Sequence, residues 1–109
     1  MELSGREEHH ISLKAAAALT AAHRNGPEGK AAGAVIGGCF GRGIVDEILA
    51  QPGCVGIRYY YGRNAAGAPV LVLVGVTADN QDMVNGTIAE EGYPCPPFCS
   101  DANPLNGEA

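Results

Sequence analysis

The segment from Pro69 to Thr77 limits the fold of this chain more than any other segment. It reads Pro-Val-Leu-Val-Leu-Val-Gly-Val-Thr, so it is apolar on both faces of the β-strand that it predicts. A strand of this kind is normally covered on both sides. The partly alternating segment 54–61 precedes it, and a glycine-containing turn joins the two, which predicts a β-hairpin. A lone hairpin is marginally stable in water, so this one needs further cover.

Two helices are predicted to supply part of that cover. The first spans about residues 12–25, because Ser12 suits the N-cap position, alanines fill the interior and Asn25-Gly26-Pro27 ends the helix. The second spans about residues 43–51, with aliphatic and acidic side chains on opposite sides. Helices packed on an antiparallel hairpin predict an α+β fold. The predicted buried stripe of the first helix consists of Leu13, Ala16, Leu19, Thr20 and His23.

The composition along the chain predicts three parts. Residues 1–10 are charged and have little to bury, which is typical of a flexible leader. Residues 11–91 hold the predicted elements and are expected to form a single α+β domain. Residues 92–109 contain four of the seven prolines and two of the four cysteines, which predicts an extended tail.

The hairpin has more apolar surface than the predicted elements can cover. Fifteen of the 23 Leu, Ile, Val and Phe residues lie between Val35 and Val76, and a small domain buries only a modest fraction of its surface unaided. We therefore expect a homo-oligomer that associates through its β region. The alternative is a third strand at residues 34–36 or 84–89 that closes the monomer. The predicted interface residues are Tyr59, Tyr61, Val70, Val72 and Val74.

The four cysteines are the main candidates for a metal site. Cys95 and Cys99 form one close pair, and Cys39 and Cys54 would complete a four-sulfur zinc site. Only one pair is close, so a Cys95–Cys99 disulfide and inert thiols stay open as alternatives. Thiol-redox chemistry by this pair has weaker support, because thioredoxin-like sites use two intervening residues at the start of a helix.

The glycine-rich segment Gly37–Gly43 is a candidate anion or nucleotide site. Backbone amides at Gly38 and Gly41, with the charge of Arg42, would face the ligand at the start of the second predicted helix. The segment matches neither the phosphate-binding loop nor the dinucleotide fingerprint, so the glycines are also explained by tight turns and close packing. No acid, base or nucleophile can be placed in the sequence, which favours a non-enzymatic protein.

Charge and hydropathy limit the kinds of partner that the sequence predicts for this protein. A net charge of −5 argues against an electrostatic grip on nucleic acid, and no apolar run is long enough to span a membrane. The N-terminus is acidic where a signal peptide would be basic, so a cytoplasmic location is expected. The leading prediction is a small, non-enzymatic, cytoplasmic assembly or binding module that self-associates.

Six segments carry a resemblance to other proteins, and Ile11–Leu13, Tyr60–Gly62 and Val72–Gly75 are the three shortest or least distinctive. The other three are more distinctive. They are Ile48–Arg58, with the core Gln-Pro-Gly-Cys-Val-Gly-Ile-Arg, Pro94–Ser100, which reads Pro-Cys-Pro-Pro-Phe-Cys-Ser, and Asn103–Asn106. Across about residues 11–106 the chain resembles a group of short, uncharacterised bacterial proteins. The resemblance implies no activity, ligand or catalytic residue. It implies only that the chain is a complete bacterial protein.

Overall fold

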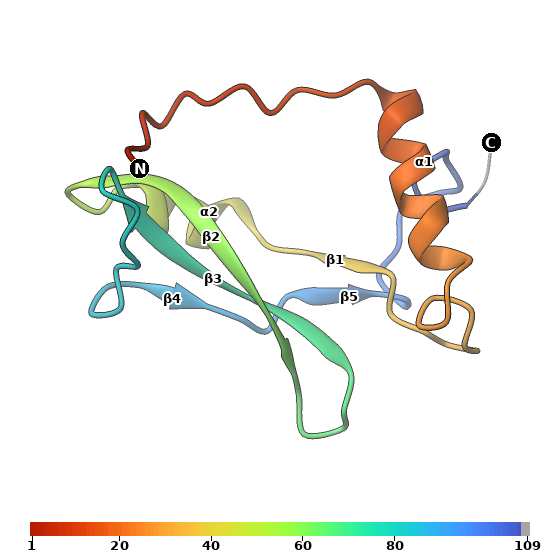
Figure 1. The fold of residues 1–109 in the computed structure, drawn as a ribbon. Coiled ribbons are helices and arrows are strands. Elements are labelled where there is room, and N and C mark those ends of the chain that lie inside the picture. The colour runs from red at the N-terminus through yellow and green to blue at the C-terminus, as the bar shows by residue number, and fades with distance from the viewer. Residues whose placement is uncertain (108–109) are drawn as a thin grey trace. The chain divides into compact units, whose positions relative to one another are not determined.

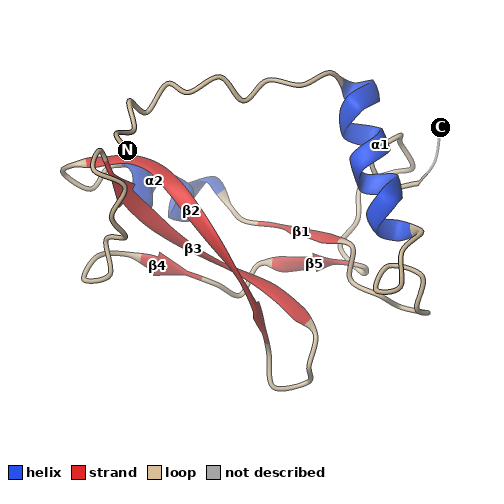
Figure 2. Ribbon diagram, viewed as in Figure 1, coloured by secondary structure: helices blue, strands red, loops and turns tan. Residues whose placement is uncertain are grey.

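The computed structural model describes residues 1–107, and the chain has an α+β fold, as predicted (Figures 1 and 2). The two helices and five strands follow one another in the order α1 (Leu13–Arg24), β1 (Gly37–Cys39), α2 (Arg42–Leu49), β2 (Cys54–Arg63), β3 (Pro69–Thr77), β4 (Ile88–Ala89) and β5 (Tyr93–Cys95). All strand pairs are antiparallel.

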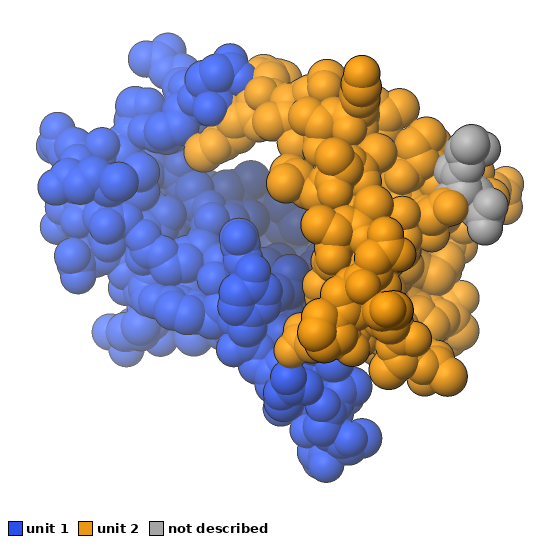
Figure 3. All heavy atoms as spheres, turned by 45° about the vertical axis from the view of Figure 1, so that its right-hand side comes forward, with its two compact units in different colours: residues 1–8, 40–92 blue, residues 9–39, 93–109 orange. Residues whose placement is uncertain are grey.

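The chain forms two compact units (Figure 3). Unit 1 contains residues 1–8 and 40–92, and unit 2 contains residues 9–39 and the C-terminal segment from Tyr93. These units differ from the three predicted parts. The reason is pairing between distant segments: the Leu3 N–H donates to the Ala78 carbonyl in unit 1, and β1 pairs with the predicted tail in unit 2.

Unit 1 is built on a three-stranded sheet in the order β2–β3–β4. The register pairs Tyr59 with Leu73 and Tyr61 with Leu71, with an irregularity between Cys54 and Gly56. The core lies between this sheet and α2, where Ile48 is completely buried. The core cluster consists of Ile48, Leu73 and Ala89, with Phe40, Ile44, Cys54 and Ile57 packed against it.

The third strand covers only half of the apolar strand β3. Ile88 and Ala89 pair with Val74 and Leu73, so residues 84–89 supply the additional strand that was the alternative to oligomerisation. Residues 73–76 are buried, whereas residues 69–72 are half-buried or exposed. The described residues of one chain therefore cover the half of the hairpin next to the core and leave the other half open.

The hairpin turn is organised by Asn64. Its side-chain oxygen accepts hydrogen bonds from the backbone amides of Ala66 and Ala68, both at 3.0 Å. Gly67 adopts a φ of 83°, which only glycine adopts without strain. β2 extends to Arg63, two residues beyond the predicted end, because the ladder continues to the Arg63–Pro69 pair next to this turn.

In unit 2, helix α1 has the predicted bounds but not the predicted buried stripe. The Ser12 hydroxyl accepts from the Ala15 amide at 3.0 Å, and Asn25 is the C-cap. No residue of α1 is fully buried, and Leu19 is 66% exposed. The helix turns its small side chains inward, and Leu13 and His23 are also exposed. The half-buried residues of α1 are Ala16, Ala17, Thr20, Ala21 and Arg24.

A two-stranded ribbon of β1 and β5 joins the two ends of unit 2. Its register pairs Gly37 with Cys95, Gly38 with Pro94 and Cys39 with Tyr93. The first of these strands lies in the glycine-rich segment Gly37–Gly43, and the second lies in the predicted extended tail. The C-terminal segment is also held to α1, because the Arg24 guanidinium donates to the Leu105 carbonyl at 2.8 Å.

Candidate functional site

The outer strand of unit 1 is the first candidate site. β2 pairs with β3 on one side, and no other strand in the part of the chain that the structure describes pairs with it. Its three consecutive tyrosines are all exposed, and Tyr61 is 83% exposed. The rings of Tyr59 and Tyr61 meet edge to face, with centroids 5.7 Å apart. We call Tyr59, Tyr60 and Tyr61, together with the unpaired side of β2, the tyrosine edge.

The predicted interface residues do not share one surface. Directly opposed residues in an antiparallel pair lie on the same face, so the register places Tyr59 and Tyr61 with Leu71 and Leu73. Val70 and Val72 lie on the other face, with Tyr60. Val74 is 4% exposed because it lies on the central strand between Arg58 and Ile88. Val74 is thus buried within this chain, and the interface role of the five residues stays a prediction.

A polar network ties the turn after β3 to β2. The Arg58 guanidinium donates to Asp82 at 2.5 Å and also to the side-chain oxygen of Asn80. The Tyr60 hydroxyl donates to the second Asp82 oxygen at 2.5 Å. Asn80 has a positive φ of 67°, a conformation that asparagine tolerates in turns.

The same network shifts the pKa values of its members. Hydrogen bonds from Tyr60 and Arg58 lower the pKa of Asp82, and the bond to Asp82 raises the pKa of Tyr60 and of Arg58. The bond from Tyr60 stabilises the Asp82 carboxylate, and both oxygens of this carboxylate are occupied. These groups form a structural latch that holds the turn after β3 against β2.

Gln51 forms a second polar junction, which the sequence analysis did not find. Its side-chain nitrogen donates to the Ile48 carbonyl at 2.8 Å, and its oxygen accepts from the Thr87 amide at 2.8 Å. Beside it lies an open depression of about 410 Å³. The lining residues are Gln51, Pro52, Asp82, Met83, Val84, Asn85 and Gly86. Asp82 is already engaged by the latch, so this lining offers no free carboxylate.

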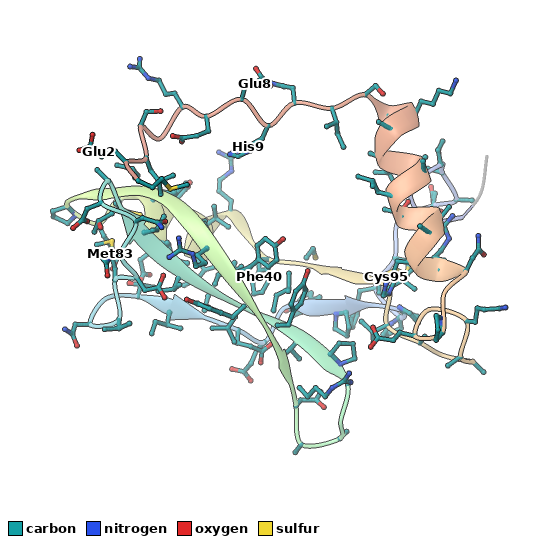
Figure 4. All side chains as sticks on the ribbon, in the orientation of Figure 1. Glu2, Glu8, His9, Phe40, Met83 and Cys95 are labelled. Carbon is teal, nitrogen blue, oxygen red and sulfur yellow. A yellow bond between two sulfur atoms is a disulfide. The ribbon has the colours of Figure 1, made fainter. Side chains whose placement is uncertain are left out.

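The four cysteines occupy different environments. Cys95 and Cys99 form a disulfide in unit 2, with Cys95 at the end of β5 (Figure 4). Cys39 is free and exposed on β1, also in unit 2. Cys54 is free and partly buried in unit 1, where its thiol contacts the Gly56 carbonyl at 3.2 Å.

The disulfide bears directly on the predicted zinc site. Oxidised Cys95 and Cys99 have no thiolate to offer a metal. Among residues 1–107, no group of three or more His, Cys, Asp or Glu side chains is placed to hold a metal ion. The four-sulfur zinc site therefore stays a prediction for the reduced chain.

The glycine-rich segment is not one loop in the structure. Gly38 lies in β1 and pairs with Pro94 in unit 2, whereas Gly41 is the N-cap of α2 and Arg42 is its first residue in unit 1. Gly41 supplies no side-chain cap to the helix. Anion or nucleotide binding at these three residues also stays a prediction.

Comparisons with protein-family models, with curated proteins and with solved structures found no match to this chain. None of the helices within residues 1–107 has both the length and the apolar character needed to cross a membrane.

Proposed function

We propose that the protein is a small, non-enzymatic, cytoplasmic assembly module, and that it self-associates by antiparallel pairing of β2 with β2 of a second copy. The observation that carries the proposal is the tyrosine edge. β2 is a ten-residue strand with one unpaired side, and its exposed tyrosines lie on both faces of the sheet.

The physical argument begins with the backbone. An edge strand offers a row of unpaired N–H and C=O groups, which is a template for another strand. Two identical strands pair antiparallel across a two-fold axis, the commonest symmetry of homo-oligomers. The hairpin has a second open edge at residues 69–72, the part of β3 that β4 does not pair with. This edge is shorter than β2 and begins with Pro69, which has no N–H to donate. β2 is therefore the favoured edge.

Side chains add to this pairing. Tyrosines are enriched at protein interfaces because each ring buries a large apolar area and keeps a polar hydroxyl. Two copies related by a two-fold axis would bring their Tyr59, Tyr60 and Tyr61 side chains together along the shared sheet. Self-association would thus cover the unpaired side of β2 and part of its exposed tyrosine surface.

The test is the molar mass of the native protein, measured by light scattering and sedimentation velocity over a range of concentrations. The wild-type protein is expected to be a dimer or larger. Tyr61→Lys places a charge on the open edge, a natural means of blocking strand pairing, and is expected to shift the protein to a monomer. The matched control is Tyr93→Lys, since Tyr93 is similarly exposed, at 63%, but lies in unit 2.

Two outcomes would contradict the proposal. A wild-type protein that stays monomeric at the highest soluble concentration removes its basis. A dimer that Tyr93→Lys dissociates and Tyr61→Lys does not would place the interface elsewhere. Circular dichroism of both variants separates loss of association from loss of folding.

A further inference from the structure

We propose that Cys39, Cys95 and Cys99 form a thiol–disulfide exchange site, in which the disulfide moves between Cys95–Cys99 and Cys39–Cys95. All three residues lie within unit 2, one as a free exposed thiol and two in a disulfide. A thiol beside a disulfide is the minimum requirement for exchange. In the proposed cytoplasmic location, disulfides are usually transient or redox-active rather than static supports.

The pairing of β1 with β5 places the free thiol on the same face as the disulfide. Cys95 stands opposite Gly37, and Cys39 lies two positions beyond Gly37 on β1. Side chains alternate along a strand, and opposed residues share a face, so Cys39 and Cys95 are diagonal neighbours. Gly37 has no side chain to separate them, and no atom lies within 4 Å of the place where its Cβ would be.

The Cα atoms of Cys39 and Cys95 have only a short distance to move before a disulfide can join these residues. Diagonal neighbours lie about 7–8 Å apart, whereas the Cα atoms of a disulfide lie about 4.4–6.8 Å apart. A slip of two residues in the register keeps every side chain on its face and brings Cys39 directly opposite Cys95.

Several features of the β1–β5 ribbon permit such a slip in register. Each strand has three residues, and all of β1 is exposed. Gly37 and Gly38 give β1 little side-chain packing, and Pro94 has no N–H to donate to the ladder. Short, glycine-rich strands specify their register weakly.

The exchange needs no oxidant, because one disulfide bond forms as another breaks. The Cys39 thiol loses its proton to solvent, and its thiolate attacks the Cys95 sulfur. A Cys39–Cys95 bond forms as the Cys95–Cys99 bond breaks, and Cys99 leaves as a thiolate that takes a proton from solvent. Cys99 is exposed, so the product carries an accessible thiol four residues before Asn103.

The full-length protein reports this exchange directly. Trypsin places Cys39 in residues 31–42, Cys54 in residues 43–58, and both Cys95 and Cys99 in residues 64–109. The protein is equilibrated with mixtures of reduced and oxidised glutathione at mildly alkaline pH, quenched with N-ethylmaleimide and digested without reduction. Mass spectrometry is expected to find residues 31–42 disulfide-linked to residues 64–109, with the alkyl group on Cys99. The undigested protein is expected to keep the mass of one chain.

Two variants define the site. Cys39→Ser is expected to abolish the linked peptides and to leave the Cys95–Cys99 disulfide in place. Cys54→Ser removes the other free thiol, which lies in unit 1, and is expected to leave the linked peptides unchanged. The proposal is overturned if the linked pair is absent at every glutathione ratio, or if it forms only between two chains. It is equally overturned if Cys54 links to residues 64–109 as readily as Cys39 does.

Discussion

Asp82 is the residue that fixes the turn after β3. Its two oxygens accept from Arg58 and Tyr60, and both donors come from β2, so one carboxylate holds the turn against the outer strand. Because hydrogen bonds from Tyr60 and Arg58 lower the pKa of Asp82, the folded state favours its ionised form.

That lowered pKa sets the direction of a pH dependence. The stabilisation by Asp82 is complete above the ordinary carboxyl pKa of about 4 and is lost as the pH falls through the lowered value in the folded protein. Asp82→Asn is therefore expected to lower the melting temperature at pH 7 and to change it much less at pH 2. Thermal unfolding followed by circular dichroism measures both. The control is Asp46→Asn, on the exposed side of α2. An equal fall in the melting temperature of both variants at pH 7 would contradict the role of Asp82 as a latch.

At the scale of elements, the two helices contribute very differently to stability. Ile48 of α2 is completely buried in the core of unit 1, whereas Leu19 of α1 is 66% exposed. Ile48→Ala is expected to lower the free energy of unfolding by about 2–5 kcal/mol, since it removes buried methyl groups and leaves a cavity. Leu19→Ala is expected to change it by less than about 0.5 kcal/mol, as for most surface substitutions.

Urea titrations of both variants measure these changes. A large loss in the free energy of unfolding for Leu19→Ala would have two possible explanations. Either α1 packs its leucines inward, as the sequence predicts, or a partner covers them. In the second case the loss would depend on protein concentration, which separates the two explanations.

The sequence predicted the elements that carry a strong local pattern. Helix α1 has a serine cap and an Asn-Gly-Pro stop, and β3 has a nine-residue apolar run, so both were found with nearly correct bounds. The strands β1 and β5 read Gly-Gly-Cys and Tyr-Pro-Cys, which show no strand pattern. They form through pairing between distant segments, and no local signal reports such pairing.

The candidate sites were predictable only in part. The exposure of Tyr59 and Tyr61 follows from their position on β2, whereas the burial of Val74 depends on β4, which pairs beside it. The spacing of Cys95 and Cys99 left zinc, a disulfide and free thiols open. The position of Cys39 beside this pair depends on the β1–β5 register, which the sequence does not encode locally.

At the scale of the whole molecule, the core is concentrated in unit 1. All five buried hydrophobic residues among residues 1–107 belong to it: Ile48, Leu73, Val74, Val76 and Ala89. Local opening costs least where few apolar side chains are buried. Unit 2 is therefore expected to open more often than unit 1.

Limited trypsin digestion of the native protein tests this difference. Cleavage after Lys30, an exposed residue of unit 2, is expected well before cleavage after Arg58, which lies within β2 and binds Asp82. Intact-mass measurements over time give both rates, and digestion in denaturing urea is the control, where the two sites should be cut at similar rates. Equal rates in the native protein would show that both units open together.

The pairing of β1 with β5 also has a consequence for synthesis on the ribosome. Every segment of unit 1 precedes Tyr93, so unit 1 can begin to fold while the C-terminal segment is still being translated. Unit 2 needs β5, which leaves the ribosome after every segment of unit 1. The nascent chain therefore presents Cys39 to the cell as an unpartnered strand residue before Cys95 and Cys99 have emerged, a period in which chaperones and small thiols have first access to it.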